Sequence, residues 1–554
     1  MTNKAVAKQL KLTADLVELT GGNPYRARAY SSGARTLERL EESVLDLLAA
    51  GGLEDVKGIG KGLVAEIEEF VATGVMGVTE SLLQALPPGL PEVLRVKGLG
   101  VKKVRVLWKD AGVTSLDDLE GAAATGRLAE LPGFGAKTVQ NILASVEELK
   151  SYRGLAHLRD AALAALAVRD TLREAGFRCE LAGPVRRQCN TVDRVDLVLE
   201  GEASDAATAL DGMPDLEVGE DRLTATLPLG LPLTVWTTVA SAFGTAWWRK
   251  TGPDAHLQAF VDTYGEPADH GDEGEIYRAA SLDPIPAPLR DDDWFQEAAD
   301  GTLPTLVQSS DLEGTVHNHT TASDGAHSLR EMCDAAQELG LSYYGVGDHS
   351  RSLKIANGLS IEDVLAQIED VQQLNQAYAD EGVDFRVFSG SEVDILSDGS
   401  MDFPDDVLDQ LEVVVASVHT GFRMTEDEAT ERVVQAVSNP HVRILGHPTG
   451  RLLLRREGYP LDHDAVLEAC AEHGVAVELN ANPWRLDVDW RFVRAATRRG
   501  VLVSINPDAH SVEGLADTRW GVASAQKGGL TAEQSLTSKP ADAFAVWLDA
   551  GGRA

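Results

Sequence analysis

The stretch VHNHTTASDG, residues 316–325, places two histidines and an aspartate within ten positions. If the stretch begins as a β-strand, His317 and His319 lie two residues apart and point to the same face of the sheet. Asp324 follows after a short polar segment. Two imidazoles and a carboxylate in this arrangement predict one corner of a metal site, which other segments would have to complete.

Histidine and carboxylate residues recur at the ends of other strand-like segments after residue 310. Strand-like and helix-like segments alternate there, a pattern typical of an α/β barrel or a doubly wound sheet. The seven strand candidates are residues 314–319, 343–349, 385–395, 411–419, 442–448, 475–481 and 501–510. The polar residues at their ends, beyond His317 and His319, are His349, Glu392, His419, His447, Asp508 and His510. Because the carboxyl ends of barrel strands meet at one mouth, we expect these side chains to gather there.

The mixture of ligand types indicates which ions would bind. Imidazole and carboxylate together suit Mn²⁺, Zn²⁺ or Fe²⁺ better than Ca²⁺ or Mg²⁺. One buried histidine at a strand end is more often a hydrogen-bonded core residue than a ligand. Ten of the thirteen histidines follow residue 310, however, and six of these are at strand ends. Without metal, these imidazoles and three carboxylates would be buried with too few partners, so the pattern predicts metal-assisted hydrolysis of a phosphate ester.

The first 150 residues carry a different repeat, built on paired glycines. The runs are VKGIGKG (56–62), VKGLGVKK (96–103) and LPGFGAKT (131–138). Paired glycines allow a tight turn whose backbone N–H groups point outward at the start of a helix, where the helix dipole favours phosphate. Glycine-capped turns without a ligand are the alternative, but three copies favour a grip on the DNA backbone. The candidate DNA-binding residues are Gly58, Gly60, Gly98, Gly100, Gly133 and Gly135.

The composition narrows the class of protein. A chain of 554 residues has room for about three to four domains. The net charge of −37 argues against indiscriminate nucleic-acid binding. Residues 1–150 hold 18 Lys and Arg against 20 Asp and Glu, so a polyanion should prefer this near-neutral part. We find neither a membrane-spanning apolar run nor a secretory signal, and we expect a cytoplasmic monomer with no membrane partner and four reduced cysteines.

The glycine runs resemble helix-hairpin-helix motifs. The stretch NPYRARAYSSGARTLERL, residues 23–40, looks like the small N-terminal domain of family X DNA polymerases. In members of that family with lyase activity, a lysine in the helix after the first hairpin attacks an abasic sugar. The matching position is Glu66, and a carboxylate cannot form a Schiff base. Lyase chemistry is therefore not expected at this position.

Residues 183–200, GPVRRQCNTVDRVDLVLE, are similar to the palm of family X polymerases. Nucleotidyl transfer needs three carboxylates around two metal ions. Two of them must share a strand face, at positions 194 and 196, but position 194 is Arg and only Asp196 remains. The best match for the third is Thr234. We expect a palm without polymerase chemistry, unless a bulge rotates Asp193 onto the same face.

The histidine-rich region closely resembles the PHP phosphoesterase domain, and the order of regions along the whole chain resembles bacterial PolX proteins. The motifs that carry the resemblance are VHNHTTASDG, VGDHSRSLKIANGL, GSEVDILSDG, ASVHTGF, GHPTGRLLLRREGY, ELNANPWRLDV and NPDAHS. The resemblance implies three divalent ions, Mn²⁺ or Zn²⁺, with Fe²⁺ as a further option. It assigns His317, His319, Glu392 and Asp508 to the first ion, Glu392, His419 and His447 to the second, and Asp324, His349 and His510 to the third.

Together, the motifs and the resemblance predict a multidomain fold. We expect an α-helical helix-hairpin-helix N-terminal region, an α+β nucleotidyltransferase-like palm and a C-terminal distorted (β/α)7 PHP barrel. The expected domains are a lyase-like domain at 1–80, further hairpins and fingers at 81–150, a degenerate palm and thumb at 151–300, and the PHP domain at 311–554.

The favoured hypothesis is a DNA repair protein that acts as a metal-dependent 3′–5′ exonuclease on gapped, nicked or 3′-ended DNA, with abasic-site endonuclease activity as an addition. The resemblance implies the polarity and the DNA substrate, whereas the ligand set implies only phosphate-ester hydrolysis. The alternatives are an active gap-filling polymerase, a phosphatase of a small phosphate monoester, and a non-catalytic DNA-gap-binding scaffold. Lys354, Arg451 and Arg485 are candidates to hold substrate phosphates, with surface pairing to carboxylates as their alternative role.

Overall fold

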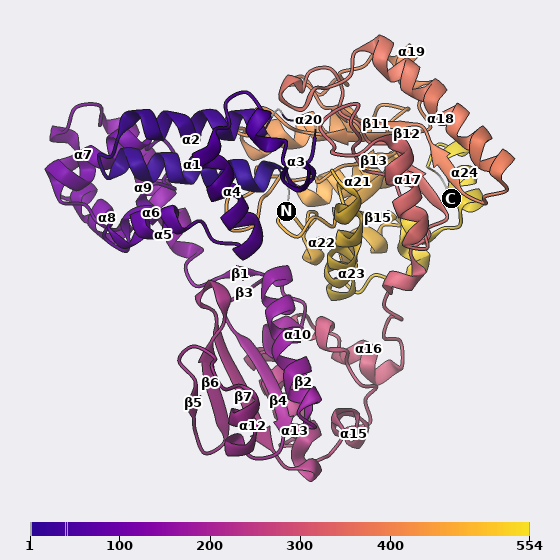
Figure 1. The fold of residues 1–554 in the computed structure, drawn as a ribbon. Coiled ribbons are helices and arrows are strands. Elements are labelled where there is room, and N and C mark those ends of the chain that lie inside the picture. The colour runs from indigo at the N-terminus through magenta and orange to yellow at the C-terminus, as the bar shows by residue number, and fades with distance from the viewer. Residues whose placement is uncertain (1–2, 39, 41, 553–554) are drawn as a thin grey trace. The chain divides into compact units, whose positions relative to one another are not determined.

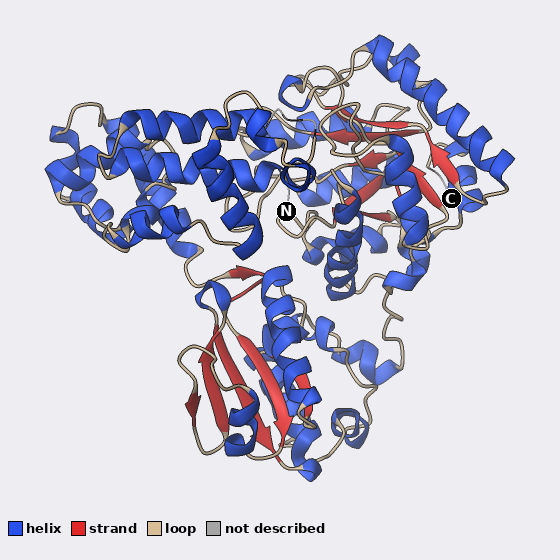
Figure 2. Ribbon diagram, in the orientation of Figure 1, coloured by secondary structure: helices blue, strands red, loops and turns tan. Residues whose placement is uncertain are grey.

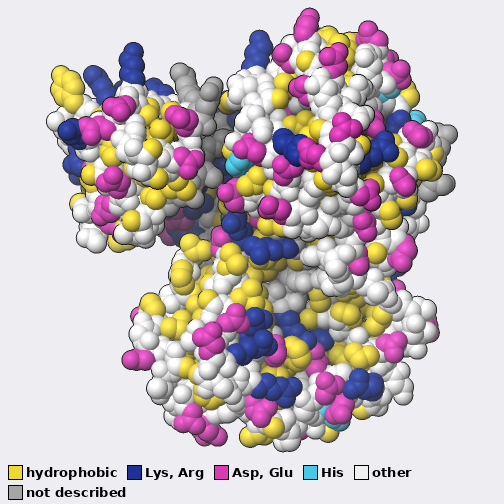
Figure 3. Space-filling model, turned by 45° about the vertical axis from the view of Figure 1, so that its right-hand side comes forward, with side chains coloured by type: hydrophobic (Ala, Val, Ile, Leu, Met, Phe, Trp, Pro, Cys, Tyr) yellow, Lys and Arg dark blue, Asp and Glu magenta, His cyan; other side chains and the backbone are white. Residues whose placement is uncertain are grey.

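The chain divides into two compact units, residues 1–153 and 154–554. The computed structural model describes residues 3–38, 40 and 42–552. In the described residues the first unit is helical, and all strands belong to the second (Figures 1 and 2). Carboxylate side chains are spread over the face seen in Figure 3, in keeping with the net charge of −37. No described helix is long and apolar enough to cross a membrane.

The first unit contains two hydrophobic cores, one around Leu10 and Tyr30 and the other around Leu107 and Leu119. Its helices are α1 (Asn3–Leu19), α2 (Pro24–Leu37), α3 (Val44–Ala50), α4 (Lys61–Thr73), α5 (Gly77–Gln84), α6 (Leu90–Val93), α7 (Val101–Ala111), α8 (Leu116–Ala124) and α9 (Ala136–Ser151), with 3-10 turns η1 (Leu53–Asp55) and η2 (Arg127–Glu130). The Asn23 side chain accepts from the backbone of Tyr25 and so fixes the start of α2.

Three of these helices begin at the predicted glycine turns. The N-caps of α4, α7 and α9 are Gly60, Gly100 and Gly135, and none has a capping side chain. The first glycine of each run has a positive φ: Gly58 (+105°), Gly98 (+85°) and Gly133 (+88°). The residues between them are buried: Ile59, Leu99 and Phe134. Each turn is thus anchored by one apolar side chain and leaves exposed glycine backbone on either side.

The second unit begins with a five-stranded sheet in the order β2-β4-β7-β6-β5, in which only β4 and β7 are parallel. Its strands are β2 (Arg178–Ala182), β4 (Val195–Glu200), β5 (Glu217–Val218), β6 (Arg222–Thr226) and β7 (Pro232–Thr238), beside a separate pair, β1 (Ala156–His157) and β3 (Thr191–Val192). Its helices are α10 (Leu158–Glu174), α11 (Gly183–Arg186), α12 (Ala203–Ala209), α13 (Phe243–Thr251), α14 (Asp254–Tyr264), α15 (Glu273–Ala279) and α16 (Phe295–Asp300), with η3 (Pro228–Gly230), η4 (Ala240–Ala242) and η5 (Ala287–Asp291).

The two faces of this sheet have different cover. Alternate residues of β4, Leu197 and Leu199, pack with α10 in one hydrophobic core. Val198 packs on the opposite face with Phe243 of α13. Asp196 shares the face of Val198. The position of the predicted palm carboxylates is therefore the α13 side of the sheet.

The rest of the unit is a barrel of parallel strands. Its strands are β8 (Gly314–Thr315), β9 (Tyr343–Gly345), β10 (Arg386–Phe388), β11 (Gly390–Asp394), β12 (Val413–Ser417), β13 (Ile444–Leu445), β14 (Ala476–Asn480) and β15 (Val503–Asn506). They form two parallel sheets, β10-β9-β8 and β11-β12-β13-β14-β15. Single parallel bridges join the sheets, His349 to Glu392 and Asn318 to Ala509. Because β10 and β11 are halves of one predicted strand, this confirms the distorted seven-stranded barrel.

Helices connect the barrel strands, as the alternating pattern predicts. They are α17 (Leu329–Glu338), α18 (Ile361–Glu381), α19 (Asp405–Leu408), α20 (Glu426–Val437), α21 (His463–His473), α22 (Trp490–Arg498), α23 (Thr518–Lys527) and α24 (Ala541–Asp549), with η6 (Ser309–Asp311), η7 (Lys354–Ala356), η8 (Val512–Asp517), η9 (Ala532–Gln534) and η10 (Leu536–Ser538). Reciprocal capping boxes begin α17 (Ser328 and Glu331) and α20 (Thr425 and Glu428). The strands are buried on both faces. The polar residues at their carboxyl ends lie at the barrel mouth.

Candidate metal centre

The structure brings together all nine predicted metal ligands, eight from strand ends and Asp324 from the loop after β8. Their potential ligand atoms form four overlapping groups, and within each group these atoms lie within 4.8 Å of one another. The groups are His319, Asp324, His349 and His510; His317, Glu392 and His447; His317, His319 and Asp508; and His349, Glu392 and His419. The shared members make one continuous cluster.

Glu392 of β11 is the centre of the cluster. Its side chain is 1% exposed, and its two carboxylate oxygens face imidazole nitrogens from five histidines. The distances are 2.8 Å to His349 Nδ1, 2.9 Å to His447 Nε2, 3.2 Å to His419 Nε2, 3.3 Å to His317 Nε2 and 3.8 Å to His319 Nε2. A carboxylate in this position can bridge two ions, as the first and second predicted sites require.

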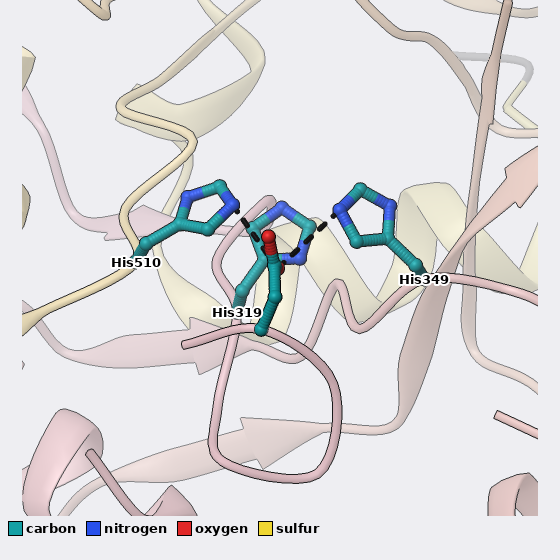
Figure 4. Close-up of side chains that lie close together, drawn as sticks. His319, His349 and His510 are labelled. Atoms are coloured by element: carbon teal, nitrogen blue, oxygen red, sulfur yellow. Dashed lines mark ion pairs between the residues drawn. The ribbon is translucent and has the colours of Figure 1, made fainter. Parts of the chain in front are cut away.

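Asp324 forms the second focus of the cluster. Its Oδ1 lies 3.2 Å from His510 Nε2 and 3.5 Å from His349 Nε2. Figure 4 shows the rings of His510 and His349 on either side of His319, with dashed lines marking ion pairs. Asp508, which has a φ of +53°, completes the group with its Oδ1 at 3.0 Å from His319 Nε2.

Hydrogen bonding within the protein does not satisfy the cluster. Among the described residues, neither oxygen of Glu392 has a hydrogen-bond partner, nor do His317 Nε2, His319 Nδ1 or His447 Nε2. A buried carboxylate with no donor costs several kcal/mol, roughly 2–7 even for a neutral polar group. Lone pairs of nitrogen and oxygen that converge on common points are the donor set of a divalent transition metal, so the residues present fit such ions.

The pKa shifts in the cluster follow from the close approach of its carboxylates and imidazoles. Burial alone would raise the pKa of Glu392, but His419, His317 and His349 hold the pKa of this carboxyl well below its usual range. Burial lowers the pKa of His319 to about 4, and the nearby His510 and His349 act in the same direction. Burial alone would lower the pKa of His317, His419 and His510, but the facing carboxylates raise it. Because only a neutral imidazole ligates a metal, binding of an ion would release protons from these rings.

Comparisons with known proteins agree with this architecture. The chain is 31% identical over 565 residues to the DNA polymerase/3'-5' exonuclease PolX of Bacillus subtilis (strain 168), an alignment that covers 97% of this chain and 98% of the relative. The chain belongs to the PolX family. Family models for a helix-hairpin-helix domain, a SAM-like helix-hairpin-helix tandem and a PHP domain match residues 1–76, 90–148 and 315–482.

The PHP domain also has relatives outside the PolX family. A probable phosphatase of Thermoanaerobacter sp. (strain X514) is 28% identical over 209 residues, which are 35% of this chain and 77% of the relative. A probable phosphatase of Syntrophotalea carbinolica is 27% identical over 239 residues, which are 41% of this chain and 93% of the relative. With the metal-suited cluster, these matches support an enzyme of the hydrolase class.

A second layer of carboxylates holds the histidines of the PHP domain in place. Glu478 of β14 lies with Oε1 2.7 Å from His317 Nδ1, and its Oε2 accepts from the backbone N–H of His447 at 2.7 Å. Asp394 of β11 pairs with His419 Nδ1. The two contacts to Nδ1 leave Nε2 of His317 and of His419 facing Glu392. We did not predict these residues, although Asp394 is two residues from Glu392 on the same strand face.

A further buried carboxylate supports the loop of Asp324. Asp348, next to His349, accepts from the backbone N–H and the hydroxyl of Thr320 at 2.8 and 2.6 Å and from the Ser323 hydroxyl at 2.5 Å. Gln367 donates from Nε2 to Asp348 Oδ2 at 2.6 Å, the oxygen that also accepts from the Thr320 hydroxyl. These contacts fix the segment that leads to Asp324. The signal in the sequence was its place beside His349.

The three predicted phosphate-binding cations differ in position. Arg485 Nε lies 3.4 Å from Asp508 Oδ2, and it is the only described Lys or Arg side chain with an ion pair to the nine. Arg451 instead donates from Nε to the backbone of Arg485 at 2.9 Å and pairs with Asp489. Lys354 is exposed on η7, and no described ion pair joins it to the cluster. Of the three, Arg485 is therefore the one beside the candidate metal ligands, and Arg451 supports its loop.

The palm of this PolX chain has a different arrangement around its remaining carboxylate. Arg194 donates from Nε to Asp196 Oδ2 at 2.9 Å, and Trp236 donates from Nε1 to Oδ1 at 3.1 Å. The partner of Asp196 across β4 and β7 is Thr234, where the third carboxylate was expected. Asp193 is exposed and pairs with Arg194, not with the sheet face. Both Asp196 oxygens are thus occupied by protein donors.

Glu66, at the position of the family's lyase lysine, is also engaged by protein groups. The Tyr30 hydroxyl donates to its Oε1 at 2.8 Å, and Arg26 Nη2 lies at 3.2 Å. Burial raises the pKa of Tyr30 to about 12, and the Glu66 hydrogen bond adds to this effect. None of the three residues, Glu66, Tyr30 and Arg26, has a primary amine that could replace the lysine.

Proposed function

We propose that this chain is a metal-dependent 3′–5′ DNA exonuclease whose chemistry takes place in the PHP domain. The single observation that carries the proposal is the convergence of five histidines on Glu392 without hydrogen bonds to its oxygens. We infer three divalent ions, Mn²⁺ or Zn²⁺, with Fe²⁺ also compatible. Their ligands are the nine residues in the scheme that the family resemblance implies.

The nine residues would together hold three divalent ions. When bound, such ions stabilise the negative charge that develops on phosphate and leaving oxygen, and they activate water as the nucleophile. Glu392 would bridge the first two ions, while Glu478 and Asp394 keep the imidazoles of His317 and His419 aimed at it. Arg485 would hold a non-reacting oxygen of the scissile phosphate beside Asp508.

We infer that the helix-hairpin-helix repeats bind the DNA substrate. The turns at Gly58, Gly98 and Gly133 leave exposed backbone at helix N-termini, and a Cβ built at Gly60, Gly100 or Gly135 would meet nothing within 4 Å. Open backbone of this kind suits the phosphodiester chain and requires little positive charge. The proposed substrates are gapped, nicked or 3′-ended DNA, and the relative from Bacillus subtilis carries both exonuclease and polymerase in its name.

Polymerase activity is not part of the proposal. Asp196 is the only one of the three required carboxylates. Its Oδ2 pairs with Arg194, and its Oδ1 accepts a hydrogen bond from Trp236. Arg186, one of the paired arginines of the palm motif, pairs with Glu273 at 2.5 Å and lies over the Trp247 ring at 3.4 Å from its centroid. These contacts disfavour binding of metal and of nucleotide phosphates.

The test uses primer–template DNA labelled at either the 5′ or the 3′ end, with Mn²⁺ and with or without dNTPs. We expect the 5′-labelled strand to become shorter one nucleotide at a time, and the 3′ label to be released as a mononucleotide. The His349→Ala variant should abolish both, and His270→Ala, which removes a palm histidine paired with Glu275, should not. Release of the 5′ label first, or full activity of His349→Ala, would overturn the proposal. Extension with dNTPs would overturn the interpretation of the palm.

A phosphatase of small monoesters is the second candidate, because the PHP domain matches two probable phosphatases. This function would require neither the hairpins nor Arg485 beside a diester. Turnover of p-nitrophenyl phosphate that exceeds DNA hydrolysis and is unaffected by Gly98→Ala would favour it. An abasic-site oligonucleotide in the same assay tests the additional endonuclease activity.

A further inference from the structure

The palm and the PHP domain share a hydrophobic core. Leu486, in the loop after β14, is 1% exposed and belongs to the core of α10 and the inner face of the palm sheet. Trp520 of α23 lies in the same core, and Leu453 packs on it from the loop after β13. Side chains from both domains therefore stabilise each other, in agreement with their place in a single compact unit.

Buried polar contacts fix the same junction. Lys527 Nζ, 2% exposed, donates to the backbone of Arg187 at 3.1 Å and pairs with Asp291. Gln188 Nε2 donates to Gln526 Oε1 at 2.8 Å. Removing a buried ammonium from its partners is strongly unfavourable. These contacts therefore hold the palm and the PHP domain in one arrangement at this junction.

The contacts of the palm fall on two loops that frame the metal centre. His157, directly before α10, donates from Nε2 to the carbonyl of Leu453 at 3.1 Å. Leu453 donates from its backbone N–H to the carbonyl of Trp484 at 2.7 Å, which ties the loop after β13 to the loop after β14. The guanidinium carbon of Arg159 lies 5.5 Å from the centroid of the Trp484 ring. One turn of the palm thus contacts both loops.

From these loops the contacts continue to Arg485. Arg451 donates from Nε to the Arg485 carbonyl at 2.9 Å, and it also donates to the carbonyl of Leu486. Leu486 has a φ of +45°, a left-handed conformation that is strained for a non-glycine residue. Because its side chain is buried in the shared core, the palm stabilises the strained turn that places Arg485 3.4 Å from Asp508.

We propose that the palm is a positioning element of the nuclease site. His157 and Arg159 hold the two loops so that Arg485 meets the substrate phosphate, although neither residue touches it. This role rests on the proposed nuclease function. It gives a reason for an intact palm in a chain whose palm lacks two of the three polymerase carboxylates.

The test is steady-state hydrolysis of the 5′-labelled primer–template by the full chain with His157→Ala and Arg159→Ala combined. We expect kcat/KM to fall about tenfold, mainly through a higher KM, because a displaced Arg485 binds phosphate less well. The combination of His157→Gln and Arg159→Lys keeps a donor and a cation, and it should recover most of the loss. Arg169→Ala, on the same helix but paired with Asp170, should change nothing.

A double-mutant cycle with Arg485→Ala isolates the route. In the Arg485→Ala background, the two palm substitutions should have no further effect. An equal tenfold loss in that background overturns the proposal, whether the loss comes from unfolding or from another contact. An unchanged KM in the palm variant also overturns it. Failure of the proposed function is a separate result, because the unsubstituted chain would then leave the DNA intact.

Discussion

Two buried carboxylates, Glu392 in the PHP domain and Asp196 in the palm, show how neighbours decide the chemistry of one functional group. Imidazole nitrogens surround Glu392, and its oxygens receive no hydrogen bond from the described residues. Arg194 and Trp236 donate to both oxygens of Asp196. The first carboxylate therefore favours bound cations, whereas protein donors already satisfy the second.

The arginines of the two regions differ in the same way. Arg485 lies next to the metal ligands through one ion pair at 3.4 Å and retains donors for a substrate. Both terminal nitrogens of Arg186 donate to the Glu273 carboxylate, at 2.9 and 2.5 Å, and its guanidinium stacks over the Trp247 ring. A phosphate would have to displace a bidentate ion pair in the palm but not in the PHP domain. The contacts that disfavour polymerase chemistry in the palm thus involve an arginine of its phosphate-binding motif as well as its remaining carboxylate.

The largest expected effect comes from matched changes to the two carboxylates. Glu392→Gln should lower DNA hydrolysis by about a thousandfold or more, because the metal charge it holds is worth several kcal/mol in the transition state. Asp196→Asn should leave hydrolysis unchanged, since its partners are Arg194 and Trp236 and no metal ion is expected there. Initial rates with Mn²⁺ and metal content after dialysis measure both. Loss of an ion or of activity in Asp196→Asn would break the comparison.

The next effect concerns the support of the ligands. Glu478→Gln removes the negative charge beside His317 Nδ1 and should weaken metal affinity or activity by about 10- to 100-fold. A Mn²⁺ titration of activity should show a higher half-saturating concentration with partial recovery at high Mn²⁺. Glu412→Gln, which changes a part-exposed glutamate paired with Arg386, is the control. Equal effects of the two substitutions would show that Glu478 has no special role.

The barrel and its nine polar residues could be predicted because both depend on local pattern. Each strand is a short apolar run, and the ligands come at or just after its carboxyl end. The strand 475–481 held none of the nine, and it was here that prediction missed Glu478. The sequence alone does not show whether a carboxylate within a strand binds the metal or holds a metal-binding histidine in place. For Glu478 the answer comes from its contact with His317 Nδ1, which only the structure shows.

Contacts between distant segments could not be predicted. Arg451 was a candidate to hold a phosphate, and nothing in the sequence indicated that its guanidinium donates to the carbonyl of Arg485, 34 residues away. The contact of His157 with Leu453 spans 296 residues and leaves no periodic signal. At Asp196, the sequence indicated the missing carboxylates, but it did not predict that Arg194 would turn back onto the remaining one.

A smaller effect should separate DNA holding from chemistry. Gly98 and Gly126 both have positive φ and open space around a built Cβ, so an alanine strains each by about 1 kcal/mol. Only Gly98 lies in a hairpin turn, so Gly98→Ala should weaken DNA binding about fivefold. Fluorescence anisotropy with labelled primer–template measures this. Weaker binding in Gly126→Ala as well would point to general loosening of the unit, whereas neither change should alter hydrolysis of a small diester.

The smallest effect on hydrolysis should come from the ionic contacts of the palm. Burial alone would raise the pKa of Glu273, but Arg290 and Arg186 lower it to about 2. Such a carboxylate stabilises the fold above its unfolded pKa of 4.5, and the contribution disappears as pH falls toward 2. The stability gap between the parent chain and Glu273→Gln should therefore shrink by about 3 kcal/mol from pH 7 to pH 2.

Thermal unfolding across this pH range measures the gap, and Glu200→Gln, which removes a part-exposed pair with Arg178, is the control with no such trend. Below its unfolding temperature, Glu273→Gln should hydrolyse DNA at a rate within about twofold of the parent chain, because its described ion pairs, with Arg186 and Arg290, include no residue of the cluster. A gap that persists at pH 2 would mean that packing, not charge, makes Glu273 important. A hydrolysis defect as large as that of Glu392→Gln would contradict the division of roles, since a carboxylate already paired with two arginines would then be part of the chemistry.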